Sequence, residues 1–196
     1  MEIMKDSIGA ILDNINNAVE YLEEDVIDNF EDIIMASNNV FVTGAGRSGL
    51  AAKAFAMRLM HLGISAYVVG ETISPAIHKN DCIIAISGSG ETNTIVSAAE
   101  IAKDRGSKVL AVTSYPESRL GKLADGYIFV KGRTKQEVDD QNYMKRQIHG
   151  NYTSLTPLGT AFELTTLVFL DAVVSELMEK MEQTESDLKA RHTVLE

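Results

Sequence analysis

Apolar residues along this chain form short, nearly continuous runs from about residue 40 onward, and most of the runs are separated by stretches of helix length. Runs of this kind are typical of strands that are buried on both faces of a sheet. We expect five strands, at residues 40–42, 66–69, 82–86, 109–112 and 127–130. Strands that alternate with helices are joined by right-handed crossovers. The pattern therefore predicts an α/β fold with a doubly wound, five-stranded parallel sheet flanked by helices.

Two further helices are predicted outside this alternation. An amphipathic pattern covers residues 3–35, with a break expected near residues 23–25, and a strongly apolar helix covers residues 158–181. Together they carry more apolar surface than one sheet can bury, so we expect a subunit interface. Residues 131–156 are polar and long for a connection, and such loops tend to carry function or to be mobile. All 196 residues are interpreted as one domain.

Charge and composition limit the possible partners. The chain has 18 basic and 28 acidic residues, which give a net charge of −10. A surface this acidic repels nucleic acid and anionic lipid, so we expect neither as a partner. The N-terminus lacks the apolar core of a signal peptide, and no apolar run reaches the ~20 residues of a membrane helix. With its single cysteine, Cys82, the chain is expected to be a cytoplasmic protein.

The first of two glycine-rich turns, residues 44–49, follows the first predicted strand and opens a helix. Its sequence, Gly-Ala-Gly-Arg-Ser-Gly, matches the G-x-G-x-x-G pattern of dinucleotide-binding proteins. Glu71 even stands where a ribose-binding acid would be sought. Taken alone, the turn leaves a dinucleotide site open, because the pattern shows only that backbone can approach a phosphate. Arg47 and Ser48 are candidate ligands of a phosphate or of sugar hydroxyls.

The second turn follows the third predicted strand and leads directly into a helix. It combines three hydroxyls and two glycines at a helix N-terminus, where backbone N–H groups and roughly half a positive charge attract anions. Helix capping is the alternative function for these hydroxyls, but capping requires only one of them. A dinucleotide enzyme does not need this second turn, and a P-loop would need a following Gly-Lys-Ser/Thr. We predict a phosphate site formed by Ser87, Gly88, Ser89, Gly90, Glu91 and Thr92.

In combination, these turns resemble the sugar isomerase (SIS) domain superfamily, whose sheet is flavodoxin-like, and within it the 6-phospho-3-hexuloisomerase family. Residues 55–63, 69–72, 157–163 and 191–196 extend the resemblance over nearly the whole chain. The tail departs from the family pattern, because Thr193 and Val194 stand where Ala or Cys followed by Asn is usual. The 131–156 connection is also longer than in compact members.

The resemblance implies interconversion of D-arabino-hex-3-ulose 6-phosphate and D-fructose 6-phosphate without a cofactor. It also implies functional coupling to hexulose-phosphate synthase in the ribulose monophosphate pathway, for formaldehyde fixation or pentose supply. Family members tend to be homotetramers whose active sites are completed by neighbouring subunits. We expect no metal site, since four scattered histidines and one cysteine show no ligand spacing.

Two side chains are candidates for the chemistry of such a reaction. Glu163 is the only acid between Asp140 and Asp171 and lies on an apolar helix comparable to the one that carries the superfamily's catalytic glutamate. It is the candidate base, and an exposed or interfacial acid is the alternative. His192 is the candidate acid or base for ring opening, with a simple tail histidine as the alternative. His61 is more simply a core or interface histidine.

Two other functions stay open. One is a related isomerase that acts on a different sugar phosphate. The other is a non-catalytic sugar-phosphate sensor, because the same domain occurs in transcriptional regulators. A sensor of that type would need a helix-turn-helix extension or a basic face, and the residues before the first predicted strand are acidic.

Overall fold

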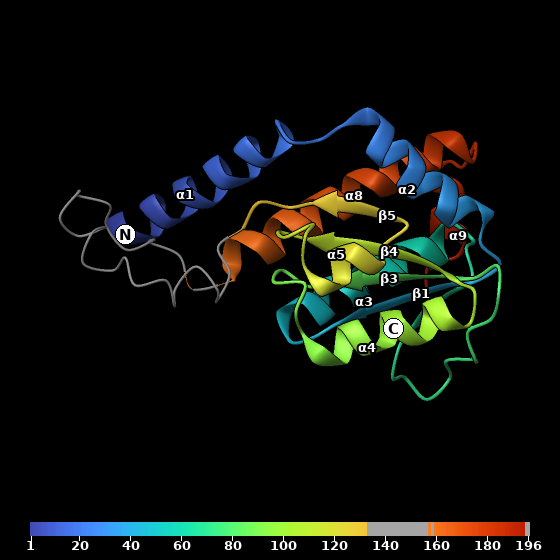
Figure 1. The fold of residues 1–196 in the computed structure, drawn as a ribbon. Helices are drawn as coiled ribbons and strands as arrows, with labels where there is room; N and C mark the ends of the chain where they lie inside the picture. Colours follow the sequence, from blue (N-terminus) through green and yellow to red (C-terminus); the bar gives the residue numbers. More distant parts are fainter. Residues whose placement is uncertain (133–156, 158, 195–196) are drawn as a thin grey trace.

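A five-stranded parallel sheet forms the centre of the molecule (Figure 1). The structure is a computed structural model and describes residues 1–132, 157 and 159–194, so the predicted connection lies outside the described residues from residue 133 onward. The strands are β1 (Val40–Gly44), β2 (Ala66–Val68), β3 (Cys82–Ile86), β4 (Lys108–Thr113) and β5 (Gly126–Phe129). Their order is β2-β1-β3-β4-β5, and every pair is parallel. The predicted sheet is confirmed.

Helices cover both faces of this sheet. The helices α2 (Glu24–Ala36), α3 (Arg47–His61) and α8 (Thr160–Lys180) pack on one face, and α1 (Glu2–Val19) packs on α8. The helices α4 (Asn93–Asp104) and α5 (Arg119–Leu123) pack on the other. The predicted N-terminal helix is thus two helices, broken at residues 20–23. None of the helices in the described ranges is long and apolar enough to cross a membrane.

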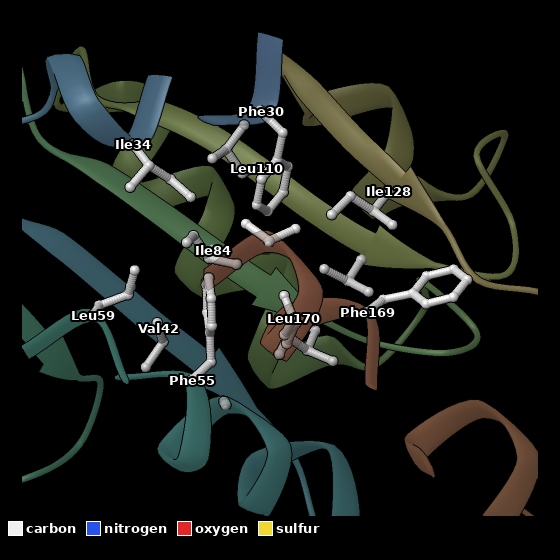
Figure 2. Close-up of a cluster of buried hydrophobic side chains, with 14 of the residues drawn as sticks. Phe30, Ile34, Val42, Phe55, Leu59, Ile84, Leu110, Ile128, Phe169 and Leu170 are labelled. Carbon is white, nitrogen blue, oxygen red and sulfur yellow. The ribbon is translucent and has the colours of Figure 1, made fainter. Parts of the chain in front are cut away.

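The alternation of side chains along the strands produces two separate cores. Val42 and Ile84 point to the face covered by α3 and α8, whereas their neighbours Phe41 and Ile83 point to the face covered by α4. Figure 2 shows the first core, in which residues of both flanking helices, such as Phe55 and Leu170, meet the strand residues. Burial on both faces explains why the strands are continuous apolar runs in the sequence.

One connection and one short helix differ from the predicted pattern. Residues 69–81, all of them described, join β2 to β3 with turns and no helix. Local hydrogen bonds stabilise this segment, since the Ser74 hydroxyl donates to the Val68 carbonyl and the Asp81 carboxylate accepts from the His78 amide. This connection therefore departs from the general alternation of strand and helix. A short helix that was not predicted, α9 (Glu185–Ala190), follows α8.

The strand order places both glycine-rich turns together. The chain leaves β1 for α3 on one face and leaves β3 for α4 on the other, while β1 and β3 are neighbours in the sheet. Ligands of open α/β sheets bind at such a switch point, beyond the carboxyl ends of the strands. The turns at residues 44–49 and 87–92 both lie there. The fold thus points to one edge of the sheet as the functional site.

Candidate active site

The glycines of the first turn have mainly a packing role. A β-carbon at Gly44 would lie 2.6 Å from the Ser48 carbonyl oxygen, and one at Gly49 would lie 2.6 Å from the Gly44 carbonyl oxygen. Both glycines therefore allow β1 and α3 to approach closely. Gly46 has a φ of 59°, and no described atom lies within 4 Å of the position its β-carbon would take. The G-x-G-x-x-G pattern thus has a structural explanation in this chain that requires no dinucleotide.

Glu71, the other feature of the dinucleotide interpretation, has a different partner. Its carboxylate accepts a hydrogen bond of 2.6 Å from the Lys53 ammonium, and both side chains are about half exposed. This ion pair joins α3 to the segment after β2. It accounts for Glu71 as a surface residue, so the position of this acid alone does not argue for a ribose site.

The second turn is shaped by hydrogen bonds of its own hydroxyls. The amide of Gly90 donates to the Ser87 hydroxyl oxygen at 3.2 Å, and that hydroxyl lies 3.2 Å from the Thr92 hydroxyl. The amide of Glu91 donates to the Ser89 hydroxyl oxygen at 3.2 Å. Gly90 has a φ of 65°, a left-handed conformation that favours glycine. Each of the three hydroxyls of the turn is therefore held by a hydrogen bond to another residue of the turn.

The N-terminus of α4 presents backbone donors of the kind that can bind an anion. Thr92 is the N-cap residue, yet within the described part of the chain its side chain makes no capping hydrogen bond. Its hydroxyl pairs with Ser87 instead. The first amides of a helix have no partner within the helix, so they can donate to an anion placed at this end. The capping alternative is therefore weakened, and the geometry favours an anion site.

Glu91 has a structural partner in this turn. Its Oε1 accepts a 2.9 Å hydrogen bond from the Arg119 amide at the start of α5. The Arg119 guanidinium in turn donates to the Asn93 side chain at 3.0 Å. These contacts tie α5 to the turn and to α4. The structure thus gives the Glu91 side chain a scaffolding contact, and its role toward a substrate stays a prediction.

The start of α8 brings Glu163 to the same edge of the sheet. The Phe162 ring would lie 3.2 Å from a β-carbon at Gly88, so α8 packs directly against the turn. Glu163 Oε2 accepts a 3.2 Å hydrogen bond from Arg47 Nε at the start of α3. The Glu163 side chain is 16% exposed and that of Arg47 is 55% exposed. A carboxylate, a guanidinium and the predicted anion site therefore meet where the strands end, and buried Ser48 is next to Arg47 in the chain.

His192 lies elsewhere in the chain. Its ring stacks on that of His61, with 5.0 Å between the ring centroids, at the C-terminal end of α3. Arg47 is at the other end of this 15-residue helix, which spans roughly 21 Å. Figure 1 shows the same separation: α8 begins at the left, where the arrows of β4 and β5 point, and α9 lies at the right. The structure therefore does not bring His192 and Glu163 of one chain together.

Metal-binding side chains do not gather in the described ranges, where no three His, Cys, Asp or Glu side chains are placed to hold an ion. Cys82 is fully buried in β3, and burial raises the pKa of its thiol to about 12. A thiol with this pKa is inert as a nucleophile. The described residues at this edge of the sheet offer carboxylate, guanidinium, hydroxyl and backbone groups.

Comparison with known proteins identifies relatives over the whole chain. Residues 33–137 match the model of the SIS domain family. A Bacillus subtilis protein named 3-hexulose-6-phosphate isomerase is 40% identical over 189 residues, which are 96% of this chain and 97% of that protein.

Two solved structures extend the likeness to the fold. A Methanococcus jannaschii protein, for which a function as 3-hexulose-6-phosphate isomerase was inferred, has a TM-score of 0.77 at 32% identity and full coverage of both chains. A hypothetical protein has a TM-score of 0.87 at 43% identity, over 100% of this chain and 98% of its own.

Proposed function

The chain belongs to the SIS domain family and, within it, to the 3-hexulose-6-phosphate isomerases, and on this premise we propose that it interconverts D-arabino-hex-3-ulose 6-phosphate and D-fructose 6-phosphate. The observation that carries this proposal is the contact of α8 with the turn, which puts the mostly buried Glu163 beside an anion site. A phosphosugar isomerase needs these two elements, one to hold the phosphate and one to move a proton.

The phosphate is anchored by residues 87–92. The amides at the start of α4 and the hydroxyls of Ser87, Ser89 and Thr92 donate to its oxygens, and the helix dipole favours the negative charge. This arrangement binds a dianion without lysine in a protein of net charge −10. Arg47 is next to the anchor and can reach the phosphate or a sugar hydroxyl, since its guanidinium is largely exposed.

Glu163 is the base. Moving the carbonyl group from C3 to C2 requires removal of the C2 proton and delivery of a proton to C3. The Glu163 carboxylate takes the C2 proton as the C2–C3 double bond forms and O3 takes up a proton from solvent, to which O2 returns one in the second step; the product of the first step is a 2,3-enediol. Collapse of the enediol with loss of the O2 proton then returns a proton to C3 on the same face. C2 is oxidised as C3 is reduced, so the substrate has no net change of oxidation state and the balance of the reaction requires no cofactor.

His192 acts from a neighbouring subunit. Fructose 6-phosphate is mostly a closed ring, and a histidine suits the proton transfer that opens it. Because His192 of the same chain is at the other end of α3, a second copy has to supply this group. Exposed apolar side chains on α1, among them Ile3, Met4, Ile8 and Leu12, offer a surface for such copies. We propose a homotetramer with shared sites, coupled in metabolism to a hexulose-phosphate synthase.

The direct test of this function is an assay with protein freed of metal. Hexulose 6-phosphate is generated in situ, and fructose 6-phosphate formation is followed by a coupled enzyme. Turnover without added metal supports the proposal. Absence of turnover, or turnover that depends on added metal, would overturn it.

Shared sites predict complementation between two inactive variants. Glu163→Gln and His192→Gln chains, unfolded together and refolded, should form mixed oligomers in which some sites combine an intact Glu163 with an intact His192. We expect the mixture to recover a substantial part of the rate of fructose 6-phosphate conversion, whereas each variant refolded alone stays inactive in that direction. A mixture no more active than the separate variants would contradict the sharing of sites between subunits.

A further inference from the structure

The tail that carries His192 is fastened to α3 by Arg191. The Nη1 atom of Arg191 donates to the His61 carbonyl at 3.1 Å and to Gln183 Oε1 at 2.9 Å, and it also lies 3.4 Å from the Asp187 carbonyl. The last carbonyls of a helix have no partner within it, and the negative end of the helix dipole favours a cation there. One guanidinium therefore joins the end of α3, the segment after α8 and α9.

Gly63 makes room for this guanidinium. It has a φ of 88°, and a β-carbon at this position would lie 3.3 Å from three atoms of the Arg191 side chain. The start of α9 is fixed independently by a capping box, in which the Thr184 hydroxyl accepts from the Asp187 amide and the Asp187 carboxylate accepts from the Thr184 amide. The residue that follows Arg191 is thus held in a defined place even though it is exposed.

His61 provides the surface on which His192 rests. Its side chain lies in the last turn of α3 and is only 4% exposed, whereas His192 is exposed. The two rings are nearly parallel, with an angle of 26° between them. If the side chain at position 61 served only to fill space in the packing, a leucine or phenylalanine would do so as well as a histidine. Packing alone therefore does not explain why a titratable ring stands at position 61.

The charged groups around His61 are mostly positive. From α3 comes Arg58, which is paired with Asp171 of α8 at 3.3 Å, and from the tail come Arg191 and His192. The strands packed against α3 contribute no charged residue. Burial lowers the pKa of His61, and the neighbouring His192 and Arg58 lower it further. At neutral pH the His61 ring is therefore uncharged.

We propose that His61 and Arg191 are positioning residues, which hold His192 in the place from which it reaches a neighbouring site and release it in acid. This inference rests on the proposed role of His192. Its pH dependence follows from linkage: the docked His192 ring contributes to the lowering of the His61 pKa, so His61 takes up a proton more readily once the tail is released. The contribution of this pair to docking is fully present above the ordinary value of 6.5 and is lost as the pH falls from there through the lowered pKa.

The docking of the tail can be measured without any activity. Hydrogen exchange of the backbone amides in residues 185–194 of the full-length protein, corrected for intrinsic rates, is compared at about pH 8 and about pH 5.5. We expect protection of these amides to fall about tenfold at the lower pH while that of β1 is unchanged. His61→Phe should keep the protection at both values, because its ring cannot be protonated. Arg191→Lys should lose protection at both, since an ammonium lacks the fork of donors.

Two variants serve as controls in this experiment. Lys189→Gln changes an exposed charge of α9 and should behave as the wild type. His61→Leu replaces His61→Phe if the larger ring prevents folding, because it also cannot titrate. Equal protection of the wild-type tail at both pH values would overturn the proposal. The proposal would also be overturned if His61→Phe or His61→Leu lost as much amide protection at the lower pH as the wild type.

Kinetics then separate this inference from the proposed function. His61→Ala should lower kcat for fructose 6-phosphate by about 10²-fold and leave KM nearly unchanged, because the phosphate turn is far from the stack. An unchanged kcat in His61→Ala, with His192→Gln inactive, would overturn the positioning role and leave the proposed function intact. Full activity of His192→Gln itself would instead remove the catalytic role of His192 on which the inference rests.

Discussion

Replacing Glu163 with glutamine is expected to lower kcat by at least about 10³-fold in both directions. The amide keeps the size of the side chain, but it cannot take the proton from C2. Its neighbours should stay in place, because Phe162 is packed on Gly88 and Arg47 can still donate to the amide oxygen. The measurement is steady-state formation of fructose 6-phosphate, with inhibition by inorganic phosphate as a separate measure of the anion site.

A matched control for this variant lies on the same helix. Glu179 is an exposed acid near the other end of α8, so Glu179→Gln should leave kcat within about twofold of the wild type. Inhibition by phosphate should be the same in both variants and in the wild type. A Glu163→Gln enzyme that retains more than a tenth of the wild-type kcat would show that the base is a different residue.

Replacing Gly90 with alanine is expected to abolish the anion site. The left-handed conformation at a φ of 65° disfavours a side chain, and a β-carbon would collide with the Ser118 hydroxyl, which caps α5. Strain and overpacking together should lower the free energy of unfolding by about 3 kcal/mol. Displacement of the turn should reduce kcat/KM by about 10²-fold or more. Urea denaturation and steady-state kinetics measure the two effects.

Gly106 offers the matched control for this change. It also has a positive φ, 81°, but a β-carbon there would make only ordinary contacts of 3.6 Å and more with the Lys79 side chain. It lies at the opposite end of α4 from the turn. Gly106→Ala should therefore lose only the roughly 1–2 kcal/mol due to conformation and keep full activity. If both variants lost the same free energy of unfolding and the same activity, the crowding around Gly90 would not be the cause of the losses.

Much of the fold could be predicted because local sequence and tertiary structure agree. The strand Cys82–Ile86 is an uninterrupted apolar run, and it is buried on both faces as such a run requires. The segment from β2 to β3 could not be predicted, since its turns depend on local side-chain contacts such as Ser74 to the Val68 carbonyl. The helix α9 has a signal that could have been used, the capping box of Thr184 and Asp187.

The candidate site was predicted in its parts, but the relation between the parts comes from the structure. The contact of Phe162 with Gly88 and the ion pair of Arg47 with Glu163 join residues more than seventy positions apart. The sequence alone could not show whether Gly44 and Gly49 serve packing or phosphate binding. Close packing of a helix and close approach of a phosphate both require a residue without a side chain. The stacking of His192 on His61 likewise had no local signal.

The position of exchanged hydrogen in the substrate tests the central claim most directly. Fructose 6-phosphate is kept with metal-free wild-type protein in D2O until many turnovers have passed, and NMR reports which carbon has acquired deuterium. A 2,3-enediol formed by Glu163 predicts deuterium at C3 with the wild type and none with Glu163→Gln. Deuterium at C1 would indicate an aldose–ketose isomerase, and hydrogen retained at C3 through repeated turnover would also contradict the account.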